Sequence, residues 1–95
     1  MKNSIMVELF AHERDFIIDL MGFYMLDELK EKLSKPKPNK DNFIKVKLDL
    51  YELETLIGDL SLEANHNKKR HVQEMAYEIA ETLESAEFSL KRKMA

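Results

Sequence analysis

The sequence predicts an α+β fold dominated by helices, with three helices and a two-stranded ribbon in a single domain over residues 1–95. Only two Gly and two Pro occur among 95 residues, and 44% of the chain is apolar, which is typical of a helix-rich globular protein. Two short alternating segments each run into a helical pattern, which indicates two strands. An all-α helical bundle is the alternative, because such short segments can also begin a helix.

The first half of the chain predicts a strand and one long helix. Residues 4–10 alternate apolar and polar side chains, as a half-buried strand does, although an early helix start also fits. Residues 11–34 carry apolar side chains at helical spacing, and their middle is apolar around most of the helix circumference. Such a helix needs cover on several sides, from other helices and a second subunit. Gly22 within it is either a tolerated glycine or the close approach of another backbone.

A basic linker follows over residues 34–42, with the sequence SKPKPNKDN. Pro36 and Pro38 cannot continue a helix, and each favours extended geometry in the residue before it. We expect a solvated, mobile loop. A basic arm that contacts phosphate is the alternative.

The second strand is expected over residues 43–48, which alternate strictly between apolar and polar side chains. Asp49 then stands where a helix N-cap is expected, and Glu52 follows three residues later. This pair is the Asp form of a capping box, and it predicts a helix that continues to residue 64.

A break at Asn65–Asn67 separates that helix from the last one, predicted over residues 68–92, although a continuous helix is also possible. The last helix has apolar residues at alternating spacings of four and three, as a heptad seam does. Such a seam serves either as core or as a dimer interface. The predicted interaction surface comprises this seam and the basic cluster before it: Lys68, Lys69, Arg70, His71, Val72, Ala76, Ile79, Leu83, Ala86 and Leu90.

The two halves resemble each other at an offset of 39 positions, where VELFAHERDFII lies over VKLDLYELETLI. Val7 aligns with Val46, and Glu13 aligns with Glu52. This alignment predicts a strand–helix duplication, with copies at residues 5–33 and 43–64, although common residue types could also produce it by coincidence. In a true duplication the two strands pair with each other.

Few residue patterns favour catalysis. The chain has no cysteine, which excludes disulfides, thiolate metal sites and cysteine nucleophiles. Glu63 and His66 form an E-x-x-H pair, but a carboxylate-bridged metal site needs a second pair from another helix. His12 and the acidic residues after it have no accompanying nucleophile or oxyanion hole. We therefore predict no catalytic residue, no metal site and no cofactor.

The run VKLDLYELETLIGDLSLEANH, from Val46 to His66, precedes a basic, Gln-containing helix start at Lys68 to Gln73. This pattern resembles one that recurs in short, mostly uncharacterised proteins of phages and mobile elements. The resemblance covers about half of the chain. It implies a small accessory protein that acts through binding, and it implies no catalytic residue.

The predicted function is therefore a non-enzymatic module for protein–protein binding or regulation, expected as a cytoplasmic homodimer. The net charge of −3 argues against a strongly basic nucleic-acid binder. The apolar window Phe16 to Leu26 contains Asp19 and is too short to cross a bilayer. The alternative is a nucleic-acid-associated regulator that uses the basic linker, the basic cluster at Lys68–His71 and the basic tail at Lys91–Lys93. No aromatic residues are interleaved with these charges in the sequence.

Overall fold

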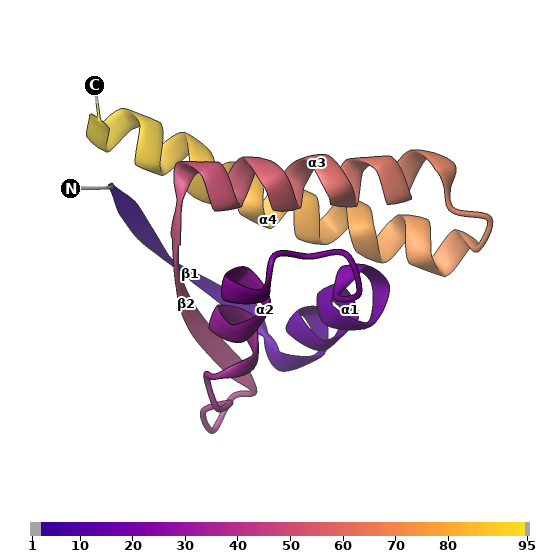
Figure 1. The fold of residues 1–95 in the computed structure, drawn as a ribbon, viewed down its shortest axis with the longest axis horizontal. Helices are drawn as coiled ribbons and strands as arrows, with labels where there is room; N and C mark the ends of the chain where they lie inside the picture. The colour runs from indigo at the N-terminus through magenta and orange to yellow at the C-terminus, as the bar shows by residue number, and fades with distance from the viewer. Residues whose placement is uncertain (1–2, 95) are drawn as a thin grey trace. The chain divides into compact units, whose positions relative to one another are not determined.

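The structure is a computed structural model that describes residues 3–94. The elements follow the order β1 (Ser4–Phe10), α1 (Ala11–Met21), α2 (Asp27–Ser34), β2 (Phe43–Asp49), α3 (Leu50–His66) and α4 (Arg70–Met94) (Figure 1). The helix-dominated α+β class is confirmed, but the structure has four helices where the sequence predicts three. The chain forms two compact units, one made of the residues up to Ile5 and from Leu48 onward, the other of Met6–Lys47.

The two strands pair in an antiparallel two-stranded sheet, as the sequence predicts. The Ala11 N–H donates to the Asn42 carbonyl over 2.7 Å, and the rings of Phe10 and Phe43 stack with their centroids 4.3 Å apart. Phe10 therefore lies opposite Phe43. In a ladder without a bulge, this register places Val7 opposite Val46.

The predicted helix over residues 11–34 is wrong, because it divides into α1 and α2 around a turn at residues 22–26. Gly22 ends α1, where its N–H donates to the Ile18 carbonyl over 2.8 Å. A Cβ atom at Gly22 would lie 2.3 Å from that carbonyl oxygen, inside van der Waals contact. The close backbone approach considered for Gly22 therefore comes from the preceding turn of its own helix.

Arg14 of α1 holds the end of α2 and the start of the linker. Its Nη1 donates to the carbonyls of Leu33, over 2.9 Å, and of Pro36, over 3.1 Å. Only 11% of the Arg14 side chain is exposed. A guanidinium satisfies these carbonyls and also complements the negative end of the helix dipole. The linker is thereby attached to α1.

The far end of the linker is ordered by Asn39. Its side-chain oxygen accepts from the N–H groups of Asp41, over 2.9 Å, and Phe43, over 3.0 Å. Asn42 adopts a left-handed conformation with φ 65°, which asparagine tolerates better than most residues. These contacts turn the chain directly into β2.

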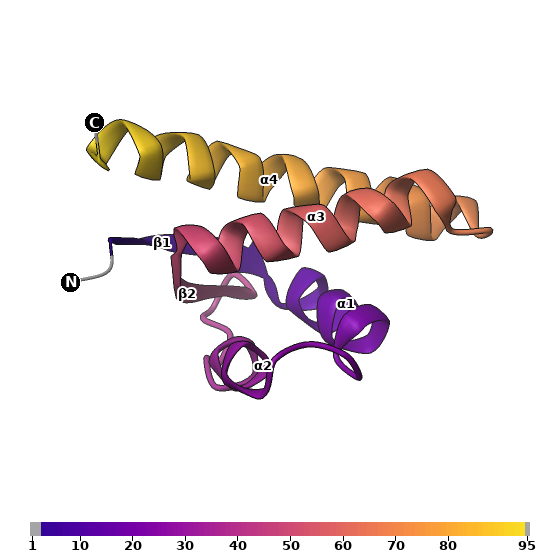
Figure 2. The same ribbon diagram turned by 45° about the horizontal axis from the view of Figure 1, so that its top comes forward.

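The other unit contains the helical hairpin of α3 and α4, which run side by side in Figures 1 and 2. The predicted capping box is present, since the Asp49 carboxylate accepts from the Glu52 N–H over 2.8 Å. The Glu52 carboxylate accepts in return from the Asp49 N–H over 3.0 Å. The predicted break is also present. Asn67, which follows α3, is extended (φ −67°, ψ 140°) rather than left-handed.

The buried apolar residues follow the predicted periods. Both strands bury every second residue, and the helices bury one stripe each. In Met6–Lys47 the buried residues are Val7, Leu9, Ile17, Met21, Leu29, Leu33, Ile44 and Val46. In the hairpin unit they are Leu48, Leu53, Leu56, Leu60, Ala76, Ile79, Ala80, Leu83 and Leu90. No polar or charged residue is buried in the described part of the chain.

Candidate interaction surfaces

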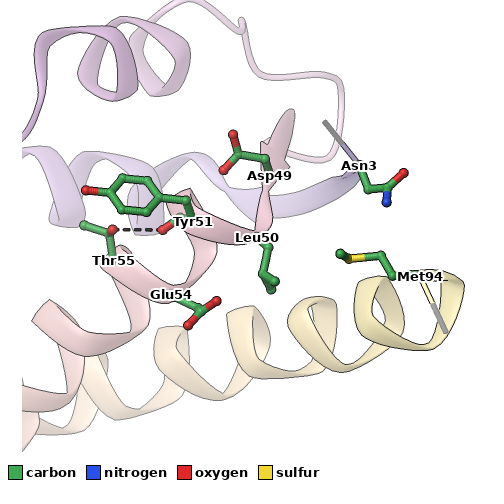
Figure 3. Close-up of a pocket in the computed structure, with 7 residues that line it drawn as sticks. All are labelled: Asn3, Asp49, Leu50, Tyr51, Glu54, Thr55 and Met94. Carbon is green, nitrogen blue, oxygen red and sulfur yellow. Dashed lines mark hydrogen bonds between the residues drawn. The ribbon is translucent and has the colours of Figure 1, made fainter. Parts of the chain in front are cut away.

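A pocket of about 660 Å³ lies where the start of α3 meets the end of α4 (Figure 3). Leu50 and Tyr51 contribute apolar surface from α3, and Met94 does so from α4. Polar groups complete the lining: Asn3, Asp49, Glu54 and Thr55. The Thr55 hydroxyl donates to the Tyr51 carbonyl over 2.8 Å, so it serves the helix. Apolar walls beside carboxylates suit an apolar side chain next to a positive charge.

The turn between α1 and α2 exposes three large apolar side chains within four residues. Phe23 is 85% exposed, Tyr24 50% and Leu26 60%. The Phe23 and Tyr24 rings meet edge to face, with centroids 4.9 Å apart. Backbone hydrogen bonds from Tyr24 N and Met25 N to the Met21 carbonyl hold the turn. We call residues Phe23–Leu26 the aromatic turn. The sequence places these side chains inside a long helix, so their common exposure was not predicted.

The heptad seam of α4 is core. Ala76, Ile79, Leu83 and Leu90 have no exposed surface, because α4 packs along α3 within the same chain. The remaining seam residues, Val72 and Ala86, are half-buried. The central residues of the predicted interaction surface are therefore not accessible to a partner in this structure.

The basic cluster at Lys68–His71 spans the turn before α4 and its first residues, and all four side chains are exposed. Arg70 forms an ion pair with Glu74 one turn later, at 3.2 Å. Asn67 organises the turn, since its side-chain oxygen accepts from the Lys69 N–H over 2.9 Å and its carbonyl accepts from the Gln73 side chain. The cluster is thus presented on an ordered turn.

Glu63 of the E-x-x-H pair contacts the turn that follows α3. The Glu63 carboxylate accepts from the Asn67 side-chain amide over 2.7 Å and so joins α3 to the turn. His66 is exposed at the end of α3. Among residues 3–94, no three His, Asp or Glu side chains are grouped as metal ligands.

The residues around His12 are also used structurally. The Glu13 carboxylate accepts from the Phe10 N–H over 2.9 Å, as Glu52 does at the start of α3. Arg14 holds α2 and the linker, and it contacts Asp15 at 2.8 Å. The His12 ring stacks on Phe10, with centroids 5.3 Å apart.

An aromatic cluster on the ribbon was missed by the sequence analysis. Phe10, His12 and Phe43 come together with near-parallel rings, at interplanar angles of 18° and 24°. Phe43 is separated from Phe10 and His12 along the chain by α1, α2 and the linker, so no run of residues interleaves the three rings with lysines. The cross-strand register, with Phe10 opposite Phe43, is the signal that would have found them.

Tyr77 is the exposed group with a clearly shifted titration. A hydrogen bond with Glu81, the negative charge of that carboxylate, slight burial and the charge of Glu84 raise the pKa of Tyr77 above its ordinary value of 10.0. These neighbours therefore favour the protonated phenol over the phenolate.

No helix among the described residues is both long and apolar enough to span a membrane. Comparison of the chain with protein-family models, with curated proteins and with solved structures finds no match.

Proposed function

We propose that this protein is a non-enzymatic binding module that acts through protein–protein contacts and associates with itself. The observation that carries the proposal is the exposure of Phe23, Tyr24 and Leu26 on one ordered turn. Exposed aromatic side chains on an ordered backbone lose little conformational entropy on binding, and aromatic anchors dominate many interfaces. The resemblance to short phage and mobile-element proteins supports an accessory role of this kind.

The surroundings of the aromatic turn favour a partner with positive charge. Asp19, Asp27 and Glu28 lie within a few residues of the turn, and all three are exposed. Carboxylates beside apolar anchors raise the association rate with a basic partner and disfavour acidic ones. In self-association, the lysines of a second copy would supply this charge.

A role in binding rather than catalysis is supported by the occupation of the polar groups. Of the side chains that the sequence offers for acid–base chemistry, Glu13 caps α1 and Glu63 joins α3 to the turn that follows it. The pocket at the α3–α4 end combines apolar surface with carboxylates and suits a ligand side chain.

Sedimentation equilibrium tests the proposal. The wild-type chain is expected to associate reversibly, and a variant with Phe23→Ser and Leu26→Ser is expected to remain monomeric. The matched control carries Phe88→Ser and Leu62→Ser, which remove the same side chains from sites that are 65% and 59% exposed. Self-association through the aromatic turn is contradicted by a monomeric wild type or by equal effects of the two variants.

The second candidate function is association with nucleic acid. Exposed lysines of the linker and of β2 favour it, because phosphate contacts supply most non-specific affinity. The basic cluster at Lys68–His71 and the tail at Lys91–Lys93 are exposed as well. Binding to an oligonucleotide that weakens with salt is the expected result.

A further inference from the structure

The solvent face of the ribbon carries a distinctive set of side chains. Alternation places Met6, Glu8 and Phe10 of β1 on this face with Lys45 and Lys47 of β2, and all five are exposed. The register that puts Phe10 opposite Phe43 puts Glu8 opposite Lys45 and Met6 opposite Lys47. One end of the face is therefore aromatic, and the β2 side is basic.

The aromatic end offers a stacking surface. Phe10 is 40% exposed and stacks with both His12 and Phe43. His12, at the start of α1, is exposed as well. Because Phe10 and His12 are exposed, these near-parallel rings can extend their stack with a planar base, and such stacking tolerates every base.

The linker adds positive charge beside this end of the ribbon. From Lys35 to Lys47 the chain has five lysines and one carboxylate, Asp41, and all six side chains are exposed. The Asn39 side chain accepts from the Phe43 N–H, and the Asn42 carbonyl accepts from the Ala11 N–H. These hydrogen bonds hold the linker next to the ends of both strands. Lys45 and Lys47 point to the same face at a spacing of about 7 Å, a distance that one extended nucleotide spans.

We propose that this ribbon face binds single-stranded nucleic acid, with bases stacked on the cluster of Phe10, His12 and Phe43 and phosphates held by Lys45, Lys47 and the linker lysines. The inference rests on the second candidate function and locates it on the ribbon. A single strand is specified because the rings require unpaired bases, which a duplex does not expose. The negative charge of Glu8 on the same face opposes phosphate binding. Affinity therefore depends on base stacking as well as on the lysines.

Fluorescence anisotropy with a labelled oligothymidylate of about 20 nucleotides tests the proposal between about 50 and 200 mM salt. The variant with Lys45→Glu and Lys47→Glu is expected to lose about tenfold or more in affinity. The loss of two phosphate contacts should also make the dependence of log affinity on log salt shallower by about 1.4. His12→Ala should weaken binding about fivefold or more without changing that slope.

The matched control carries Lys30→Glu and Lys32→Glu, which change the net charge equally on α2, outside the ribbon and the linker. It should leave binding within about twofold of wild type at the higher salt, where charges outside the site are screened. Circular dichroism confirms that each variant is folded.

Four results would overturn the proposal, and they are distinguishable. Equal losses in both charge-reversal variants would show that only total charge matters. Tighter binding to the matching duplex would exclude a stacking site. If the wild type binds and the variants at Lys45, Lys47 and His12 bind equally well, the ribbon site is excluded. The second candidate function then remains possible elsewhere on the protein. No binding by the wild type at about 50 mM salt would contradict both the ribbon site and the second candidate function.

Discussion

Asp49 and Glu52 close the start of α3 by exchanging hydrogen bonds between their side chains and backbones. Replacing Asp49 with Ala removes the acceptor for the Glu52 N–H, so the free energy of unfolding should fall by about 1 kcal/mol. Chemical denaturation measures this loss. Asp49→Asn keeps the acceptor and serves as the control. An unchanged denaturation midpoint in Asp49→Ala would show that the cap contributes nothing.

The two glycines should respond in opposite directions to the same substitution. Gly22→Ala places a Cβ atom against the Ile18 carbonyl and should destabilise the protein by about 1–3 kcal/mol. Gly58→Ala lies within α3, where a Cβ atom has no neighbour within 4 Å, and should stabilise by about 0.5–1 kcal/mol. Thermal denaturation of the pair gives the comparison. A stabilised Gly22→Ala would contradict the close contact with Ile18.

Arg14 is the residue on which the arrangement of α1, α2 and the linker depends. Arg14→Ala leaves two carbonyls without their cationic donor and should lower the free energy of unfolding by about 1.5–3 kcal/mol. Arg14→Lys offers a single ammonium in place of the planar fork and should restore part of the loss. Chemical denaturation of the wild type, Arg14→Ala and Arg14→Lys measures their order of stability. A stability of Arg14→Ala equal to wild type would make these contacts incidental.

At the scale of single elements, sequence predicts well where the signal is local. The start of α3 follows from Asp49 and Glu52, and both strands follow from alternation, since these patterns depend on residues a few positions apart. The sequence does not predict the division between α1 and α2, because apolar residues continue at helical spacing through Gly22 and Leu26, as in a single helix. The contact of Arg14 with Pro36 and the stacking of Phe10 on Phe43 join residues that are far apart in the chain. No periodic sequence pattern therefore indicates them.

The hairpin of α3 and α4 depends on residues of the α4 seam. Ile79→Asp puts a carboxylate at a position with no exposed surface and should cost about 4 kcal/mol or more, enough to unfold a small domain. Ile79→Val should cost only about 0.5–1.5 kcal/mol. Circular dichroism and denaturation test both. A folded, monomeric Ile79→Asp protein would show that the side chain does not lie in a core.

Asp59 of α3 makes stability depend on pH. Partial burial raises its pKa above the ordinary value of 3.8, so the folded state disfavours its ionised form. The folded protein therefore binds the proton more tightly, and stability falls as pH rises from 3.8 through the folded pKa. Asp59→Asn should be more stable than wild type at neutral pH, with the difference absent below the ordinary carboxyl range. Denaturation at the two pH values checks the sign.

For the whole molecule, the strand–helix duplication stays a prediction, and the order of the elements can be compared at its offset of 39 positions. Both strands and the helices after them begin at the same offset, with β1 at Ser4 and β2 at Phe43, α1 at Ala11 and α3 at Leu50. Equivalent residues are buried, as Ile17 and Leu56 are, and Glu13 repeats the hydrogen bond of Glu52. Of the two predicted copies, residues 5–33 and 43–64, the first includes most of a second helix, α2, whereas the second ends within α3.

The ribbon places Val7 opposite Val46, and these two valines are equivalent residues in the predicted duplication. If two identical chains paired in this antiparallel register, each outward side chain would occur twice on the ribbon, once on each strand. The predicted duplication joins the copies in one polypeptide and removes that requirement, since Glu8 aligns with Lys47 and Met6 aligns with Lys45. The joined ribbon consequently has a polarity, and an elongated ligand lying along it can distinguish one orientation from the other.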